Sequence, residues 1–224
     1  MDHIEHLTSL YDVAGRTAAD VGTGKGHFAK QLARCGAIVT GIEIEETKVA
    51  AANARMPEGS KVVQGRGEDL PLETASQDLV CFMYSFHHIP ISVHEKALAE
   101  ATRVLKPHGR LHFVEPMPES CASDPMKLID DETHVRTCSH ARIRALSTED
   151  RFELLNTKQY QLSYAYEDFD SYISSIIGVD PERAAKLPAA RDEMERLFYR
   201  YARFEDGKYG FDKPCTAYHF QMID

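Results

Sequence analysis

The chain has 224 residues, with 26 Lys and Arg against 35 Asp and Glu, and a formal net charge of -9 at pH 7. This length fits one α/β domain with an elaboration, large enough to bury a core. The dispersed basic residues argue against a nucleic-acid partner, because a phosphate backbone needs a positive surface. No apolar run reaches the roughly 20 residues of a membrane span, and the polar N-terminus lacks a signal-peptide pattern. We therefore expect a cytoplasmic protein with no membrane partner.

The cysteines predict reduced thiols. They are odd in number, widely spread and never arranged as C-x-x-C, which argues against disulfides and against a zinc site. They are Cys35, Cys81, Cys121, Cys138 and Cys215.

Residues 17–115 alternate strand-like apolar runs with amphipathic helical stripes. This pattern is typical of a parallel sheet covered by helices on both faces. We expect an α/β fold with strands near residues 17–21, 37–42, 61–64, 78–83 and 109–114.

The most informative motif is DVGTGKG, which starts at Asp20 where the first strand turns into a helix. Glycines at such a turn adopt strained backbone angles and let a ligand lie against the main chain. Gly22, Gly24 and Gly26 are evenly spaced, unlike the dinucleotide fingerprint, which places its third glycine three residues after the second. An acid at the start of the motif suits a ligand that carries positive charge. The turn therefore favours S-adenosylmethionine over a dinucleotide.

The second apolar strand ends at Glu43. An acid about twenty residues after a glycine turn can accept both hydroxyls of an adenosine ribose. The glycine turn and this acid lie in one βαβ unit, and together they strengthen the prediction of an adenosine-containing cofactor.

The reaction site is expected beyond the carboxyl ends of the strands, where open α/β sheets bind ligands. This places the segment Phe82–His88 and Glu115 at the site. Of the candidate bases there, the pair His87 and His88 is favoured, since an imidazole can take a proton near neutral pH. Glu115 and Tyr84 are further candidates. A histidine that only packs at the strand exit is the alternative, and Glu115 could instead bind a cationic substrate or cap a helix.

An acidic cluster follows, in a helix that we expect to run from Asp124 to about Leu146. Asp130, His134 and Cys138 are four residues apart, on one helical face, which invites a metal site. The other interpretation is an acid-rich helix start that favours the helix dipole and faces water. We favour the second and predict no metal. Arg136 could pair with these acids or bind a carboxylate substrate.

The C-terminal third is rich in aromatic residues, with eight of the ten tyrosines from Tyr160 onward. We expect a strand near 152–163, then two or three helices within 167–205 that break at residues 178–181 and at Pro188, and a last strand at 216–222. The aromatic residues either form a core or cover a flat acceptor.

With the glycine turn, Glu43, GRGEDLPLETASQDLV and ALAEATRVLKPHGRLHFVEP in view, the chain resembles the class I S-adenosylmethionine-dependent methyltransferases. It is most similar to the small-molecule group of the ubiquinone and menaquinone biosynthesis type (methyltransferase type 11), over residues 17–115. The resemblance implies a Rossmann-like, doubly wound seven-stranded sheet, mostly parallel with a reversed last strand. It also implies methyl transfer from S-adenosylmethionine that leaves S-adenosylhomocysteine.

The resemblance implies roles for individual residues. Asp20, Gly22, Gly24 and Gly26 would hold the methionine end of the cofactor, Glu43 its ribose, and Gly67 and Glu68 would flank its adenine. Ile44, Phe82 and Met83 are further expected cofactor-binding residues. The chain has Arg66 where many members have an acid, so the adenine contact falls to Glu68 or to backbone groups.

We thus expect a single methyltransferase domain over 1–224, with a cofactor-binding core at 17–115 and a helical substrate lid at about 117–150 and 165–210. The expected acceptor is a small molecule, flat or aromatic. Its methylated atom (N, O, S or C) and the oligomeric state stay open. The alternatives are a protein or RNA methyltransferase, a non-catalytic S-adenosylmethionine-binding partner protein and, least favoured, a dinucleotide oxidoreductase. Against the first stands the segment FMYSFHHIP, which lacks the Asn/Asp-Pro-Pro-aromatic signature of adenine-amino methylases.

Overall fold

The computed structural model describes residues 2–119 and 124–223. The chain divides into two compact units. Unit 1 comprises the described residues of Met1–Glu115, Cys138–Lys158 and Thr216–Asp224, and unit 2 those of Pro116–Thr137 and Gln159–Cys215. Among the helices of the described residues, none has the length and apolar character to cross a membrane.

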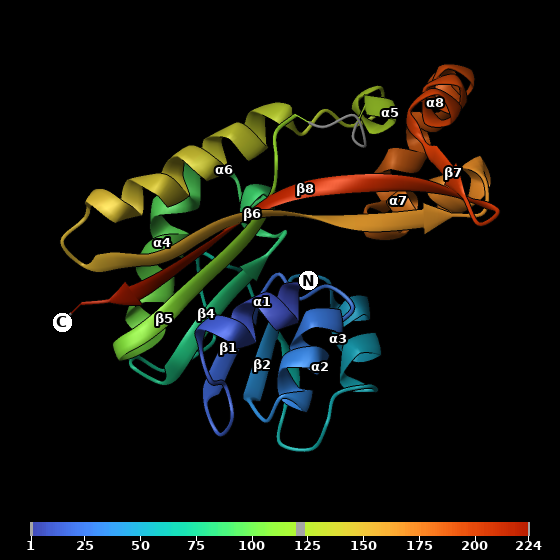
Figure 1. The fold of residues 1–224 in the computed structure, drawn as a ribbon. Coiled ribbons are helices and arrows are strands. Elements are labelled where there is room, and N and C mark those ends of the chain that lie inside the picture. Colours follow the sequence, from blue (N-terminus) through green and yellow to red (C-terminus); the bar gives the residue numbers. More distant parts are fainter. Residues whose placement is uncertain (1, 120–123, 224) are drawn as a thin grey trace. The chain divides into compact units, whose positions relative to one another are not determined.

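The described strands form one eight-stranded sheet in the order β3-β2-β1-β4-β5-β8-β6, with β7 paired to β8. Strands β1 to β5 run parallel to one another, for example with Thr17 of β1 opposite Ile38 of β2, and Figure 1 shows β8 running against β6. The strands are β1 (Thr17–Val21), β2 (Ile38–Glu43), β3 (Lys61–Gln64), β4 (Gln77–Met83), β5 (Leu105–Pro116), β6 (Phe152–Tyr166), β7 (Arg203–Glu205) and β8 (Lys208–Met222).

Helices fill the connections between the strands. They are α1 (His3–Leu10), α2 (His27–Arg34), α3 (Glu46–Asn53), α4 (His94–Val104), α5 (Asp124–Lys127), α6 (Thr133–Ala145), α7 (Phe169–Val179) and α8 (Leu187–Tyr201). Short 3-10 helices are η1 (Phe86–His88), η2 (Ile91–Val93), η4 (Leu146–Thr148) and η5 (Pro181–Ala185).

This architecture confirms the predicted α/β class with a mostly parallel sheet and a reversed last strand. The sheet has eight strands where seven were predicted, because the short strand β7 forms an antiparallel hairpin with β8. The single helix expected from Asp124 to Leu146 is also wrong, since the chain leaves the helix after Lys127 and begins a new one at Thr133. The side chain of Asp131 accepts a hydrogen bond from the Thr133 amide. Such a local bond competes with a continuous helix.

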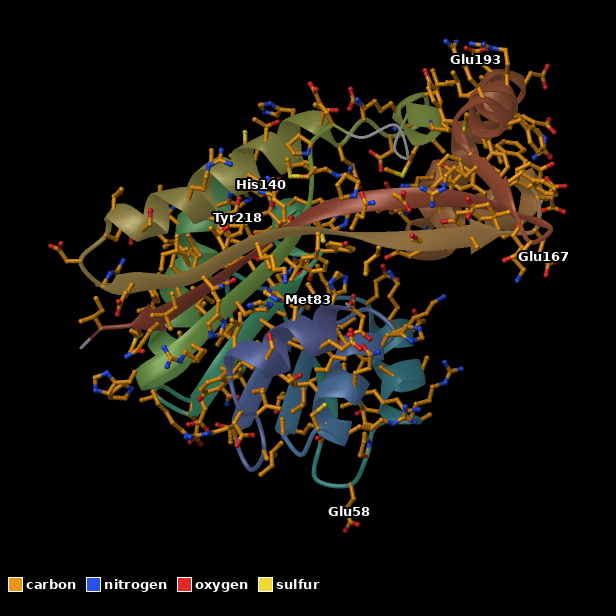
Figure 2. The ribbon with its side chains drawn as sticks, in the orientation of Figure 1. Glu58, Met83, His140, Glu167, Glu193 and Tyr218 are labelled. Atoms are coloured by element: carbon orange, nitrogen blue, oxygen red, sulfur yellow. The ribbon has the colours of Figure 1, made fainter. Side chains whose placement is uncertain are left out.

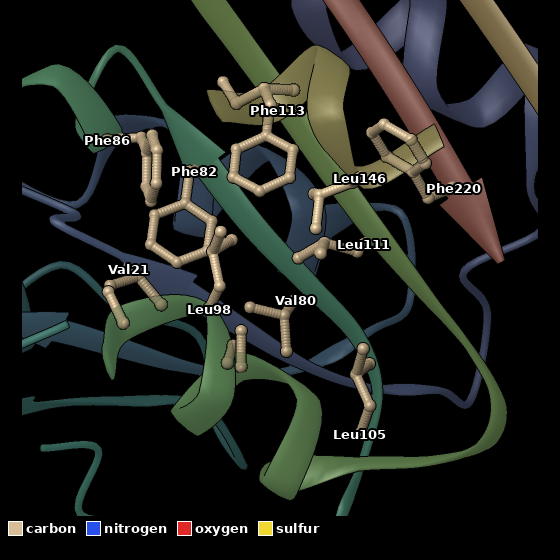
Figure 3. Close-up of a cluster of buried hydrophobic side chains, with 14 of the residues drawn as sticks. Val21, Val80, Phe82, Phe86, Leu98, Leu105, Leu111, Phe113, Leu146 and Phe220 are labelled. Atoms are coloured by element: carbon tan, nitrogen blue, oxygen red, sulfur yellow. The ribbon is translucent and has the colours of Figure 1, made fainter. Parts of the chain in front are cut away.

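The core of unit 1 has two halves, one on each face of the sheet. On one face, α1 and α2 pack Leu7, Phe28 and Leu32 against the strands. On the other, α4 packs Leu98 against Phe82 and its neighbours, which Figure 3 shows together with Phe86 and Phe113. The rings of Phe82 and Phe113 stack at 5.0 Å on adjacent strands. This packing fixes the ends of β4 and β5, from which the candidate bases project.

Unit 2 has an aromatic core of its own, around Phe198 of α8, which is fully buried. Its ring lies 5.2 Å from Tyr172 and 5.2 Å from Phe211, and 5.6 Å from Phe169. Aromatic pairs at these distances add stability beyond the area that they bury. The expected helix break at residues 178–181 is confirmed by the end of α7 at Val179, whereas Pro188 lies in the first turn of α8 and breaks nothing.

Candidate functional site

The glycine turn connects β1 to α2 and requires glycine for two different reasons. Gly22 has φ +75, and a Cβ placed on it would lie 2.5 Å from the Cβ of Ser85. Gly24 has φ +57, and a Cβ placed on it would meet no atom within 4 Å. Gly22 is therefore needed for packing, whereas Gly24 borders open space where a ligand can approach the backbone. Gly26 is the N-cap of α2 and bears no side-chain cap.

Asp20 lies under this turn with its side chain almost fully buried. Its Oδ2 accepts a hydrogen bond from the Thr23 hydroxyl at 2.6 Å. Among the described residues, no donor reaches its buried Oδ1. Burial, and to a lesser degree the negative charge of Glu43, raise the pKa of Asp20 to about 6, although the Thr23 and Ala29 hydrogen bonds oppose this rise. A carboxylate in this position favours a cationic ligand group.

Glu43 joins the end of β2 to the glycine turn. Its Oε2 accepts a hydrogen bond from the Gly24 amide at 2.8 Å, and its Oε1 accepts from the amides of Ile44 at 2.9 Å and Glu45 at 3.1 Å. Each carboxylate oxygen has further acceptor capacity for a hydroxyl group. Glu43 thus holds the turn in shape and retains acceptors for a diol, whereas the side chain of Ile44 is 48% exposed.

The loop after β3 brings Gly67 and Glu68 to the same end of the sheet. A Cβ on Gly67 would lie 2.6 Å from the Cδ1 of Ile89, so the loop packs closely against the segment that follows β4. The Arg66 guanidinium lies 3.8 Å from the Glu68 carboxylate. Arg66 therefore offsets part of the charge of Glu68.

The residues at the end of β4 differ in exposure. Phe82 is fully buried in the core of unit 1, so its side chain packs rather than offers contacts to a ligand. Met83, labelled in Figure 2, is half-buried. Tyr84 has φ 54, which is rare for a residue with a side chain, and its ring lies edge-on to His3 at 5.0 Å. The strained turn at Tyr84 directs the chain into η1.

A buried hydrogen-bonded pair joins the exits of β4 and β5. The Nδ1 of His87 lies 2.5 Å from the Oε2 of Glu115, and both side chains are almost completely buried. The other oxygen of Glu115 accepts the Phe86 amide at 3.0 Å. Burial raises the pKa of Glu115, but the charge and hydrogen bond of His87 outweigh it, and the net pKa is lowered. With Glu115 ionised, the proton of His87 is held on Nδ1 and Nε2 is a hydrogen-bond acceptor.

The two adjacent histidines are not equivalent. Their rings lie 4.2 Å apart, but only His87 is paired with Glu115, and the His88 side chain is exposed. The sequence placed His87 and Glu115 at the same edge of the sheet without predicting that they pair. It also missed Ser139 of α6, whose hydroxyl lies 3.4 Å from Glu115. No motif marks a serine that lies 24 residues away on a helix.

Further hydrogen bonds hold α6 in unit 1. The Nδ1 of His140 lies 2.9 Å from the hydroxyl of Tyr218 on β8, and Figure 2 labels both residues. This contact fixes α6 beside Glu115, whose pKa the charge of His140 also lowers.

The acidic cluster of unit 2 is committed to ion pairs. Asp130 and Glu132 both bind Arg183 at 2.8 Å, and Glu132 also pairs with Arg136. Asp131 caps the start of α6 and is exposed. Asp130 and Glu132 are therefore ion-pair partners of arginines. None of the four described cysteines is in a disulfide, and Cys121 lies outside the described residues.

The fold and the glycine turn are those of a Rossmann-like α/β protein. Residues 19–113 match the family model described as a methyltransferase domain. Over these residues the chain is similar to that family.

Individual relatives agree with this family. An uncharacterized methyltransferase of Bacillus licheniformis is 28% identical over 49% of this chain and 51% of its own length. A ubiquinone biosynthesis O-methyltransferase of Xanthomonas oryzae pv. oryzae is 34% identical over 48% of this chain and 46% of its own. The chain thus spans about half the length of the curated relatives that it matches. The crystal structure of a Bacillus halodurans protein, proposed to be a methyltransferase, has a TM-score of 0.69 at 21% identity, over 99% of this chain and 97% of that one, and shares the fold.

Proposed function

We propose that this chain transfers the methyl group of S-adenosylmethionine to a small-molecule acceptor that loses a proton. The observation that carries the proposal is the match of residues 19–113 to the methyltransferase domain, together with the turn that it contains. Support for a small acceptor comes from the net charge of -9, which disfavours a nucleic acid. It also comes from the relative named for ubiquinone biosynthesis.

The residues of the turn fit the proposed cofactor. The buried Oδ1 of Asp20 lacks a donor among the described residues, and the ammonium group of the methionine end would supply one. Gly24 leaves the backbone open to that ligand, and Glu43 offers acceptors for the ribose hydroxyls. Gly67 and Glu68 are proposed to flank the adenine. S-adenosylmethionine supplies a methyl group on a sulfonium leaving group.

The proposed base is the Nε2 of His87, with Glu115 as the group that positions it. The Nε2 of His87 would take the proton that the acceptor loses, and bound S-adenosylmethionine would supply the methyl group and keep the electron pair of its carbon–sulfur bond on sulfur. The resulting imidazolium is stabilised by the Glu115 carboxylate at 2.5 Å. A positioned base contributes about 10²- to 10⁴-fold to rate, and alignment of the two reactants contributes about 7–11 kcal/mol.

The test of the reaction is transfer of label. The full chain is incubated with methyl-labelled S-adenosylmethionine and a metabolite extract, and the expected product is a labelled small molecule. Label in protein or RNA alone would support a macromolecular methyltransferase. Binding of S-adenosylhomocysteine without label transfer would support a non-catalytic partner protein. Tight binding of NADH, with no binding of S-adenosylhomocysteine, would support an oxidoreductase. Each of these results overturns the proposal.

The test of the base compares His87→Gln with His88→Gln, using whichever labelled product the first experiment yields. We expect His87→Gln to lower kcat about 100-fold or more, with unchanged affinity for S-adenosylhomocysteine. His88→Gln is expected to lower kcat far less. A larger loss for His88→Gln would assign the base to the exposed histidine instead.

A further inference from the structure

In unit 2, the carboxylate of Glu132 binds two arginines. Its Oε1 binds Arg183 at 2.8 Å and its Oε2 binds Arg136. Both arginine side chains are largely buried, and Arg183 also donates to the carbonyl of Ile176 at 3.2 Å. Glu132 therefore has its charge shared between two guanidinium groups.

A third cation, Lys213 of β8, lies close enough to Glu132 and its two arginines for their charges to shift its pKa. Its Nζ lies 4.6 Å from the centre of the Tyr164 ring on the neighbouring strand β6. Within the described part of the chain, it makes no ion pair. Its partly buried ammonium therefore has an aromatic face as a contact and no carboxylate of its own.

The surroundings of Lys213 disfavour its charge. The pKa of Lys213 is lowered to about 8, mainly by burial and then by the positive charge of Arg136. The charge of Arg183 lowers this pKa further, whereas the negative charge of Glu132 raises it. A cation held in such a place gains most from an anion that enters from outside.

The side chains around Lys213 indicate what kind of anion fits. Residues alternate between the faces of a strand, so Lys213 and Phe211 lie on one face of β8. Phe211 belongs to the aromatic core of unit 2, with Tyr166 at 6.3 Å and with Tyr164 packed against the same core. An ammonium group beside aromatic rings is suited to a flat ring that carries a negative group.

We propose that Lys213 is an anion-binding residue of unit 2 that takes the carboxylate of an aromatic acid. The inference goes beyond the proposed function and concerns unit 2 alone. Lys213 takes no part in moving a proton.

The probe is benzoate, titrated into the full chain at pH 7 by calorimetry in the presence of S-adenosylhomocysteine. We expect saturable binding that weakens about tenfold or more in Lys213→Met, since a charge-assisted contact is lost. Lys213→Arg should retain the binding. The matched control is Lys208→Met, which removes an exposed lysine from the same strand and should leave benzoate affinity unchanged.

A second measurement separates charge from shape. Between pH 7 and 9, benzoate affinity should fall in the wild type as Lys213 loses its proton, and stay constant in Lys213→Arg, whose guanidinium remains charged. The charged groups around Lys213 are Arg136, Arg183 and Glu132, and burial raises the pKa of the neighbouring Tyr164.

Two results would overturn the inference: no saturable benzoate binding to the wild type, or equal affinity in Lys213→Met. The outcome is independent of the proposed function, which is judged by label transfer and S-adenosylhomocysteine binding. Loss of hydrogen-exchange protection across unit 2 in Lys213→Met would mean that the variant disturbs the fold of that unit. In that case the inference is tested by how benzoate affinity depends on pH in the wild type and in Lys213→Arg. The same pH dependence in both proteins would refute the role of Lys213.

Discussion

At the scale of single residues, the buried carboxylate of Asp20 lowers the stability of the folded protein at neutral pH and is expected to favour binding of the cofactor. Its pKa is raised to about 6 in the folded protein by burial, above the ordinary 3.8 of an aspartate. The contribution of Asp20 to the stability of the folded state is therefore fully present below pH 3.8 and is lost as the pH rises through 6. At neutral pH the ionised group costs on the order of 3 kcal/mol. A cationic ligand would offset this cost.

We therefore expect Asp20→Asn to be more stable than the wild type at pH 7.5 by up to about 3 kcal/mol. The difference should shrink toward zero near pH 4, and the variant should bind S-adenosylmethionine more weakly. Urea unfolding at both pH values and calorimetry measure these effects. A variant that is less stable at pH 7.5 would contradict the assignment.

Gly24 allows a test of ligand contact against backbone strain. Gly24→Ala and Gly59→Ala each place a Cβ at positive φ in open space, so each should lose about 1–2 kcal/mol of stability. Because Gly59 lies outside the glycine turn, only Gly24→Ala is expected to weaken binding of S-adenosylhomocysteine. Equal affinities in the two variants would remove Gly24 from the cofactor site.

At the scale of elements, buried histidines join α1 to the sheet. The rings of His6 on α1 and His112 on β5 lie 6.0 Å apart, and the Nδ1 atoms of His112 and His219 on β8 lie 3.2 Å apart. Burial lowers the pKa of His219 to about 4, with Arg110 and His6 adding to the effect, and lowers the pKa of His112 well below its usual value. The folded state therefore holds these imidazoles neutral.

This arrangement predicts acid sensitivity. Because the folded-state pKa is lowered, the stability that His219 contributes is present above its unfolded pKa of about 6.5 and is lost as the pH falls toward 4. Between pH 7.5 and 5, the wild type should lose about 2 kcal/mol more than His219→Phe. The control His27→Gln, at an exposed site, should follow the wild type. Equal losses in the wild type and His219→Phe would contradict the prediction.

At the scale of the whole molecule, the chain forms two compact units, each with a core of its own. The proposed cofactor residues all belong to unit 1, whereas Phe198 is at the centre of the aromatic core of unit 2. Binding of the methyl donor should therefore be separable from the integrity of unit 2.

The expected effect of Phe198→Ala is a loss of about 3–5 kcal/mol from unit 2, with S-adenosylhomocysteine affinity unchanged. Tyr199→Ala, a neighbour on α8 that is 43% exposed, is the matched control and should cost far less. Hydrogen exchange resolved by peptide reports each unit separately. If Phe198→Ala also abolished cofactor binding, the two units would unfold as one.

The sequence by itself determined the fold class, strands β1 and β3 to the residue, and the cofactor turn, because strand periodicity and glycine spacing are local properties of the chain. Tertiary structure alone decided that His87 rather than His88 pairs with Glu115, that Glu132 also binds Arg183, and that no carboxylate of the described residues pairs with Lys213. The residues of these pairs are far apart in sequence, and nothing local records which side chains meet. DVGTGKG thus predicts the methyl donor, whereas these charge contacts depend on folding.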